Sequence, residues 1–148
     1  MDAQITDVSR VIQLAVAPVF MLTGIATLIN AMNTRLGRVV DRSRIVRERL
    51  KQGGSAEQLD EYTRELRVLV HRSRLVYLGI LYSVLAALLV CLVIAGAFIG
   101  ALNSVDLAKT VAIMFILAMT SMIISLGMFL REVYLGVGVG GAGSLPER

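Results

Sequence analysis

Three long stretches of this chain contain no charged side chain. Residues 11–34, 75–105 and 110–130 are 24, 31 and 21 residues long and contain no Asp, Glu, Lys, Arg or His. About 20 apolar residues in a helix are enough to cross the hydrocarbon core of a bilayer. A soluble domain of 148 residues could not bury three such stretches in a single core. The sequence therefore predicts an all-α integral membrane protein with three transmembrane helices.

The basic residues are concentrated in one place, which predicts the orientation of the chain. Residues 35–74 contain 11 of the 15 Lys and Arg residues, and basic residues near the ends of spans stay in the cytoplasm. We therefore expect residues 1–10 to form a short external segment and 103–109 an external link. The spans are then 11–34, 75–102 and 110–130, and residues 131–148 form a flexible, Gly-rich cytoplasmic tail. Attraction to anionic membrane lipids explains this basicity, so no nucleic-acid partner is expected.

The basic segment, residues 35–74, has the apolar spacing of a coiled coil. Steps of three and four residues separate two series of mostly apolar side chains. These are Leu36, Val39, Ser43, Val46 and Leu50, then Leu59, Tyr62, Leu66, Leu69, Ser73 and Val76. Gly53-Gly54-Ser55 lies between them and predicts a turn at 53–55, which gives an antiparallel helical hairpin. Asp41 is expected to pair with Arg67, and Arg47 with Glu61.

The same hairpin brings four arginines to the membrane face. We call them the basic collar: Arg35, Arg38, Arg72 and Arg74. Residues suited to catalysis are few, because the chain has one His and one Cys, and a zinc site usually needs three or four such ligands. The sequence therefore predicts no enzyme activity, no metal site and no cofactor.

Small residues recur every four positions in the second span. This ladder consists of Gly79, Ser83, Ala87, Cys91 and Ala95, with Gly96 and Gly100 as an adjacent GxxxG pair. Small residues let helix backbones approach closely in lipid. Packing within one chain and packing between chains explain the ladder equally well. Three spans enclose little protected interior, so we expect a homo-oligomer.

The first span carries a stripe of neutral polar side chains, which we call the polar stripe. Its polar members are Gln13, Thr23, Thr27, Asn30 and Thr34, and its sixth member is the apolar Phe20. Val16 is a further apolar residue on the same face. Such hydroxyls and amides can bond their own helix or a neighbouring one. In a symmetric oligomer the same face would line a wet pore. Pro18 removes one backbone hydrogen bond and is a candidate hinge.

Several short segments together resemble a known family. They are APVF at 17–20, LTGI at 22–25, NTRL at 33–36, DRSR at 41–44, RSRL at 72–75 and FLREV at 129–133. The chain resembles, over roughly residues 5–135, the bacterial membrane family known as domain of unknown function 2721. The resemblance implies a three-span protein of the bacterial inner membrane and assigns no functional residue.

Two functions from different classes fit these features. The first is a homo-oligomeric pore that conducts monovalent ions, with the first span lining it and the hairpin forming a vestibule or gate. The second is a non-conducting scaffold or regulatory protein, whose hairpin docks a cytoplasmic protein partner. The charged faces of the hairpin fit the second function as well as the polar stripe fits the first.

Overall fold

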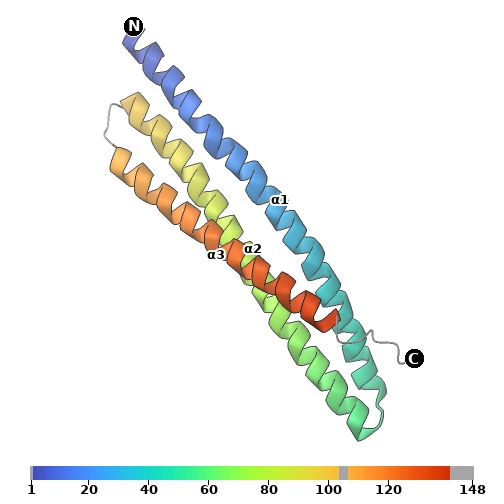
Figure 1. The fold of residues 1–148 in the computed structure, drawn as a ribbon. Helices are drawn as coiled ribbons and strands as arrows, with labels where there is room; N and C mark the ends of the chain where they lie inside the picture. Colours follow the sequence, from blue (N-terminus) through green and yellow to red (C-terminus); the bar gives the residue numbers. More distant parts are fainter. Residues whose placement is uncertain (1, 104–106, 141–148) are drawn as a thin grey trace, which may run out of the picture. The chain divides into compact units, whose positions relative to one another are not determined.

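The computed structural model describes the backbone of residues 2–103 and 107–140 and the side chains of 12, 13, 15–102 and 107–134. These residues form three helices and no strand: α1 (Asp2–Gln52), α2 (Ala56–Asn103) and α3 (Ala108–Gly140), drawn in Figure 1. Each helix contains a stretch that is long and apolar enough to cross a membrane. The chain is therefore all-helical, as predicted, with three candidate transmembrane helices.

The break between α1 and α2 follows from its three residues. Gly53 adopts a φ of 79°, a left-handed conformation that strains any residue with a Cβ. The Ser55 hydroxyl accepts a hydrogen bond from the Gln58 backbone N–H at 3.4 Å. The Gln58 side-chain oxygen accepts one from the Ser55 N–H at 3.2 Å. This reciprocal capping box stops the chain from continuing as one helix and starts α2.

Two helices are longer than the sequence predicts. α1 begins at Asp2, so the backbone of the expected external segment is already helical, and it runs through Pro18 without interruption. α3 extends to Gly140, which corrects the expectation that the chain becomes a flexible tail after Glu132. Adding a residue to an existing helix needs no new nucleus, so the helix continues into the glycines. The rest of the tail, 141–148, lies outside the described residues.

The chain divides into two compact units. Unit 1 comprises residues 1–30 and 81–124, and unit 2 comprises 31–80 and 125–148. Unit 1 has an aliphatic core in which Ile25 of α1 meets Ala86 and Val90 of α2 and Ala118 of α3. The hydroxyl of Ser121 donates a 2.8 Å hydrogen bond to the Tyr82 carbonyl, which links α3 to α2. Small and aliphatic side chains therefore hold unit 1 together.

Unit 2 is packed along the predicted coiled-coil series. Val39 and Val46 of α1 and Leu69 of α2 form a buried cluster, and Leu50, Tyr62 and Leu66 pack against it. At the other end of the unit, the Ser125 hydroxyl donates a 2.8 Å hydrogen bond to the Gly79 carbonyl. A Cβ added at Gly79 would lie 3.0 Å from the Met32 Cε atom. The absence of a side chain at Gly79 therefore lets all three helices approach closely.

Candidate functional site

The most unusual side chain in unit 2 is a buried carboxylate, Glu132 of α3. Its side chain is 1% exposed, and two arginines from different helices bind its two oxygens. Arg35 Nη1 of α1 donates to Oε2 at 3.0 Å, and Arg72 Nη2 of α2 donates to Oε1 at 2.8 Å. We call Arg35, Glu132 and Arg72 the ion triad. It ties the three helices together through charged groups.

The position of Glu132 follows from the spacing along α3. Buried and half-buried side chains recur along this helix in steps of three and four residues, which is a coiled-coil seam. The seam consists of Val111, Met114, Ala118, Ser121, Ser125, Met128 and Glu132. Glu132 thus occupies a core position, where an acid is rarely found unless it is paired.

The arginines are placed by α1 and α2 in the same way. Each directly precedes a residue of its own coiled-coil series, Leu36 after Arg35 and Ser73 after Arg72, so each lies at the edge of the packed face. The Arg35 guanidinium carbon also lies 5.4 Å from the centre of the Phe129 ring. A cation over an aromatic face is attracted by the ring quadrupole. Phe129 and Glu132 therefore both orient Arg35.

The ion triad does not balance its own charge. Two guanidinium groups and one carboxylate leave a formal charge of +1. The Arg72 Nε atom is buried and has no hydrogen-bond partner among the described residues. The Arg35 side chain is 39% exposed and that of Arg72 is 17% exposed, whereas the carboxylate is covered. The surface of the triad that solvent can reach is therefore cationic.

The four arginines of the basic collar differ in their contacts. Arg35 and Arg72 meet on Glu132, whereas Arg38 and Arg74 are exposed and form no ion pair among the described residues. The predicted pairs Asp41–Arg67 and Arg47–Glu61 are wrong: Arg42 Nε binds Glu65 Oε1 at 2.7 Å instead.

Arg42 pairs with Glu65 because of the angular positions of these two residues around their helix axes. Arg42 and Glu65 each directly precede a residue of the packed series, Ser43 and Leu66, and so lie at its edge. Asp41 is two residues from both Val39 and Ser43, which places it on the opposite side of the helix from the packed face. Residues at the same level of two helices pair only if they also lie on facing edges.

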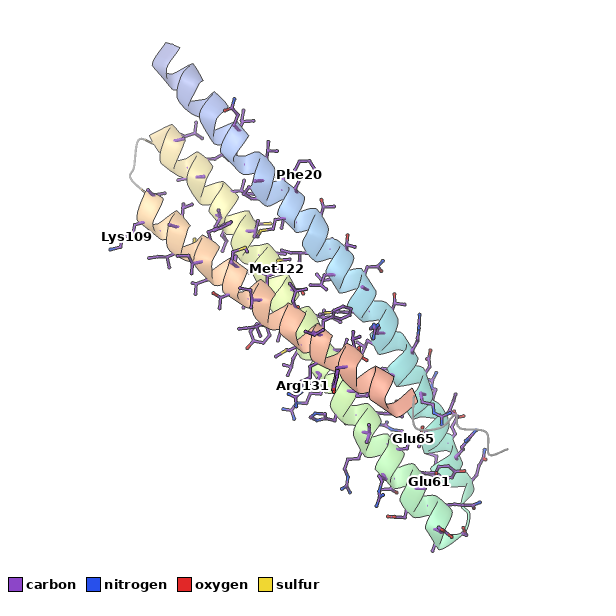
Figure 2. The ribbon with its side chains drawn as sticks, in the orientation of Figure 1. Phe20, Glu61, Glu65, Lys109, Met122 and Arg131 are labelled. Carbon is purple, nitrogen blue, oxygen red and sulfur yellow. The ribbon has the colours of Figure 1, made fainter. Side chains whose placement is uncertain are left out.

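The polar stripe lies on the exposed surface of α1. Its six members are all exposed: Gln13, Phe20, Thr23, Thr27, Asn30 and Thr34. Phe20 is 74% exposed and points away from its helix (Figure 2). The Thr27 hydroxyl donates a 2.9 Å hydrogen bond to the Thr23 carbonyl, which satisfies it within the helix. The stripe is therefore not part of the core of either unit.

The small-residue ladder of α2 is only partly buried. Gly79 and Ser83 are buried and Ala87, Gly96 and Gly100 are half-buried, whereas Cys91 and Ala95 are exposed. A step of four residues turns a helix by about 400°, so each member lies about 40° further round than the last. The buried residues Val76, Gly79, Ser83, Ala86, Val90 and Val93 instead follow steps of three and four. Successive ladder residues therefore lie progressively further from the packed face of α2.

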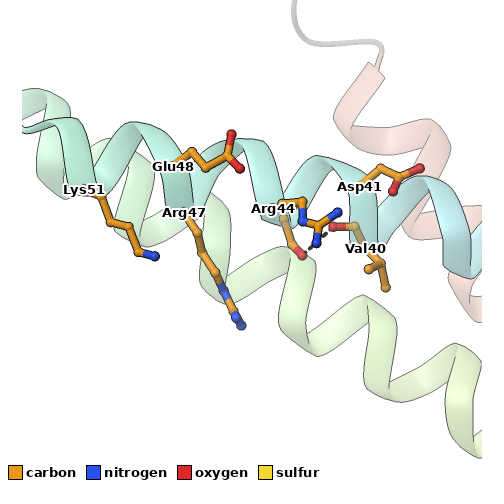
Figure 3. A pocket seen from close by; sticks show the side chains of 7 residues that line it. Val40, Asp41, Arg44, Arg47, Glu48 and Lys51 are labelled. Atoms are coloured by element: carbon orange, nitrogen blue, oxygen red, sulfur yellow. Dashed lines mark hydrogen bonds between the residues drawn. The ribbon is translucent and has the colours of Figure 1, made fainter.

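Unit 2 also has a shallow groove on the outer face of α1. It has a volume of about 440 Å³ and is lined by Val40, Asp41, Ser43, Arg44, Arg47, Glu48 and Lys51. Figure 3 shows Arg47 and Lys51 extending to one side of the helix and Asp41 and Glu48 to the other. The Ser43 hydroxyl bonds the Val40 carbonyl at 2.7 Å. Such a surface offers charges of both signs to a partner.

Glu132 and Phe129 were not expected to be site residues from the sequence. The signal was present, because the three-and-four spacing of α3 continues beyond the charge-free stretch and ends on Glu132. Three of the segments that carry the family resemblance, NTRL, RSRL and FLREV, supply Arg35, Arg72 and Glu132. Among the described residues, no group of three or more His, Cys, Asp or Glu side chains could hold a metal ion.

Comparisons with known proteins assign the chain to a family. No curated protein and no solved structure matched it. The model of the family described as Protein of unknown function (DUF2721) matched residues 15–139, which include the polar stripe from Phe20 onward, the basic segment and the ion triad. The chain therefore belongs to the DUF2721 family.

Proposed function

We propose that this protein forms a homo-oligomeric ion-conducting pore in the bacterial inner membrane, with α1 lining the pore. The observation that carries this proposal is the exposure of the polar stripe. Its five polar members all lie on the surface of the chain, although they belong to one of the three helices that could cross a membrane. Polar groups on a membrane helix usually face a protein or a water-filled cavity and not lipid.

Helix geometry supports a role for the stripe outside the chain's own core. Thr23 and Thr27 lie two residues before and after the buried Ile25. Two residues turn a helix by about 200°, so both threonines lie on the side of α1 opposite Ile25. Thr34 has the same relation to the buried Met32. A second copy of the chain, or water, is the natural neighbour for that face.

A ring of such faces could form a conducting path. Hydroxyl and amide oxygens repeated around an axis can replace part of the hydration shell of a monovalent ion. Phe20 and Val16 are exposed on the same face and would form an apolar constriction, and Pro18 would act as the hinge beside it. The basic segment would form a cytoplasmic hairpin that serves as vestibule or gate, with the N-terminus outside.

The test is single-channel recording of the purified protein in planar bilayers under asymmetric KCl. Discrete currents are expected from the native chain. The double variant Thr27→Leu and Asn30→Leu should lose them, because leucine removes the oxygens and narrows the path. Assembly should persist, which light scattering on the detergent-solubilised variant would measure. The reversal potential would give the preference for cations or anions.

A matched control comes from α3. Thr120 is exposed, and its hydroxyl bonds the Ile116 carbonyl at 2.8 Å, as that of Thr27 bonds Thr23. Thr120→Leu therefore makes the same chemical change away from the stripe and should leave the current intact. Unchanged current in the Thr27/Asn30 variant would eliminate α1 as the lining. Silence from a monodisperse native oligomer, across voltages and under tension, would eliminate the pore.

The groove on α1 favours the second candidate, a non-conducting scaffold that docks a protein partner. Val40 lines the groove, and Ile45, Val68 and Val70 are further exposed apolar side chains of the same charged segment. Apolar contacts framed by charges are typical of protein interfaces. Full-length protein with Arg44, Arg47 and Lys51 changed to Gln should then lose a partner that native protein captures from solubilised membranes. Equal recovery with both baits would count against docking there.

A further inference from the structure

We propose that the ion triad is a binding site for the phosphate group of an anionic phospholipid. Arg35 and Arg72 would contact the phosphate, and Glu132 would act as a positioning residue that fixes both guanidinium groups. The proposal does not depend on ion conduction. It rests on the level of the triad along the helices, its charge, its exposure and its unused hydrogen-bond donors.

The triad lies at the end of the apolar part of all three helices. Arg35 is the first charged residue after the charge-free stretch 11–34, and Arg72 lies three residues before the stretch that starts at 75. Glu132 follows the end of the stretch 110–130 by two residues. Hydrogen bonds of 2.8 and 3.0 Å place these three points at one level. In a membrane that level is the headgroup region, where lipid phosphates lie.

The charge distribution of the triad suits an anion. Its formal charge is +1, and the negative group is buried at 1% exposure, whereas both positive groups are partly exposed. An approaching phosphate would meet Arg35 and Arg72 and not the carboxylate. His71, Arg74 and Arg131 are exposed nearby in the sequence and add no negative charge. A bound phosphodiester would bring the triad and its ligand to neutrality.

The arginines retain the donors that a phosphate needs. A guanidinium group has five N–H donors in a planar fork, and Arg35 and Arg72 each donate one bond to Glu132. The Arg72 Nε–H is buried and has no partner among the described residues. The donors open to a phosphate are therefore the remaining Nη N–H groups of these two partly exposed side chains. One guanidinium group can bind two phosphate oxygens at once through two parallel, short, charge-assisted hydrogen bonds. Glu132 and Phe129 pre-orient these forks, which lowers the entropy lost on binding.

Phosphate from a lipid and phosphate from solution share this chemistry, and the level of the triad favours the lipid. The test is native mass spectrometry of the full-length protein in neutral detergent, which counts individual bound lipids without a charged membrane surface. Phosphatidylglycerol would be titrated against zwitterionic phosphatidylcholine. A parallel arm would replace lipid by inorganic phosphate and record the thermal unfolding midpoint.

The decisive variant replaces the whole triad, with Arg35→Gln, Arg72→Gln and Glu132→Gln made together. It leaves no charge buried without its partner, so the fold should be kept, which circular dichroism and size-exclusion chromatography would check. The matched control is Arg38→Gln, because Arg38 belongs to the basic collar but not to the ion triad. Both variants lower the net charge by one unit, so a difference between them reports the site and not total charge.

We expect the triple variant to bind the first phosphatidylglycerol about tenfold more weakly or worse, because it loses several charge-assisted hydrogen bonds. Arg38→Gln should bind it nearly as well as the native protein, and phosphatidylcholine binding should change in neither. Equal losses in the two variants, or no loss in the triple variant, would overturn the proposal. Stabilisation by inorganic phosphate that is absent from the triple variant would overturn the lipid as the source.

Glu132→Gln alone tests the positioning role. The native protein and this variant would be compared for the ratio of phosphatidylglycerol to phosphatidylcholine affinity. If Glu132 only stabilises the fold, the ratio should stay unchanged or rise with the added positive charge. A fall in the ratio in a variant that remains folded would support positioning. An unchanged or higher ratio would overturn that role.

Discussion

Unit 1 and unit 2 bury different kinds of side chain. In unit 1 the buried residues are aliphatic or small, and the polar ones among them are Ser83 and Ser121. Unit 2 buries the coiled-coil cluster around Val46 and, in addition, the carboxylate of Glu132. The small and aliphatic side chains of unit 1 suit lipid. The hydrophobic effect does not drive helices together there, so their association depends on close packing. The buried carboxylate of unit 2 suits the edge of the membrane, because a charged side chain can form its ion pair there before it becomes buried.

Two Arg–Glu contacts within unit 2 also differ in how far they are exposed to solvent. Arg42–Glu65 has side-chain exposures of 48% and 32%, whereas Glu132 in the ion triad is 1% exposed. An exposed pair gains little because water screens it, and a buried group left without its partner is costly. The two contacts have the same chemistry but should differ several-fold in the effect of their loss.

The largest effect is expected at Glu132. Glu132→Gln keeps the size of the side chain but leaves Arg35 and Arg72 facing each other without a counter-charge. Breaking a buried charge network typically costs about 3–5 kcal/mol, and we expect about 2–4 kcal/mol here because Arg35 is partly exposed. The free energy of unfolding in mixed micelles, followed by circular dichroism, would measure it.

The triple Gln variant is the control for that prediction. It removes the two arginine charges together with the carboxylate and should be more stable than Glu132→Gln alone, because no uncompensated charge remains. A loss below about 0.5 kcal/mol in Glu132→Gln, the range of an ordinary surface substitution, would mean that the triad does not hold the helices together.

A smaller effect is expected in unit 1. Ser121→Ala removes the hydrogen bond to the Tyr82 carbonyl that joins α3 to α2. Such interhelical bonds average about 0.6 kcal/mol in membrane proteins, with a maximum of about 1.7. The neighbouring Thr120 bonds its own helix, so Thr120→Val should cost less. Equal losses would show that the link between the helices adds nothing to the packing of unit 1.

The smallest effect is expected at Glu65. Glu65→Gln removes the exposed ion pair with Arg42 and should cost about 0.2–1 kcal/mol at low salt. In 1 M KCl the difference from the native protein should vanish, since the screening length falls to about 3 Å. The cost of Glu132→Gln should persist in the same salt. Equal salt dependence would mean that Glu132 is as accessible to water as Glu65.

Much of the fold could be predicted from local patterns in the sequence. The absence of charge from three stretches was enough to predict three long apolar helices, because bilayer thickness sets the length that such helices need. The spacing of Val39, Val46 and Leu69 predicted the packed face of the basic segment, since side-chain direction follows from helical periodicity. The orientation in the membrane, the oligomer and the pore remain predictions.

The ion triad could not be predicted by the same reasoning. Arg35, Arg72 and Glu132 lie on three helices, and the sequence does not state which edges of those helices face each other. The Asp41–Arg67 prediction is wrong for the same reason. It rested on the position of each residue along its helix and not on its angular position around the helix axis. The expected tail at 131–148 also excluded Glu132 from the predicted core, although Glu132 continues the seam through Ser125 and Met128. Extending that seam by one step would have placed an acid in the core.

The sequence separation within the ion triad has a consequence for biogenesis. Glu132 lies 97 residues after Arg35 and 60 after Arg72. At a synthesis rate of about 5–20 residues per second, Arg35 emerges roughly 5–20 s before its counter-ion. A nascent chain with only two inserted helices therefore carries two arginines whose shared acid has not yet been made. Formation of the ion triad therefore distinguishes a chain whose third helix has packed against the first two from a chain whose third helix has not.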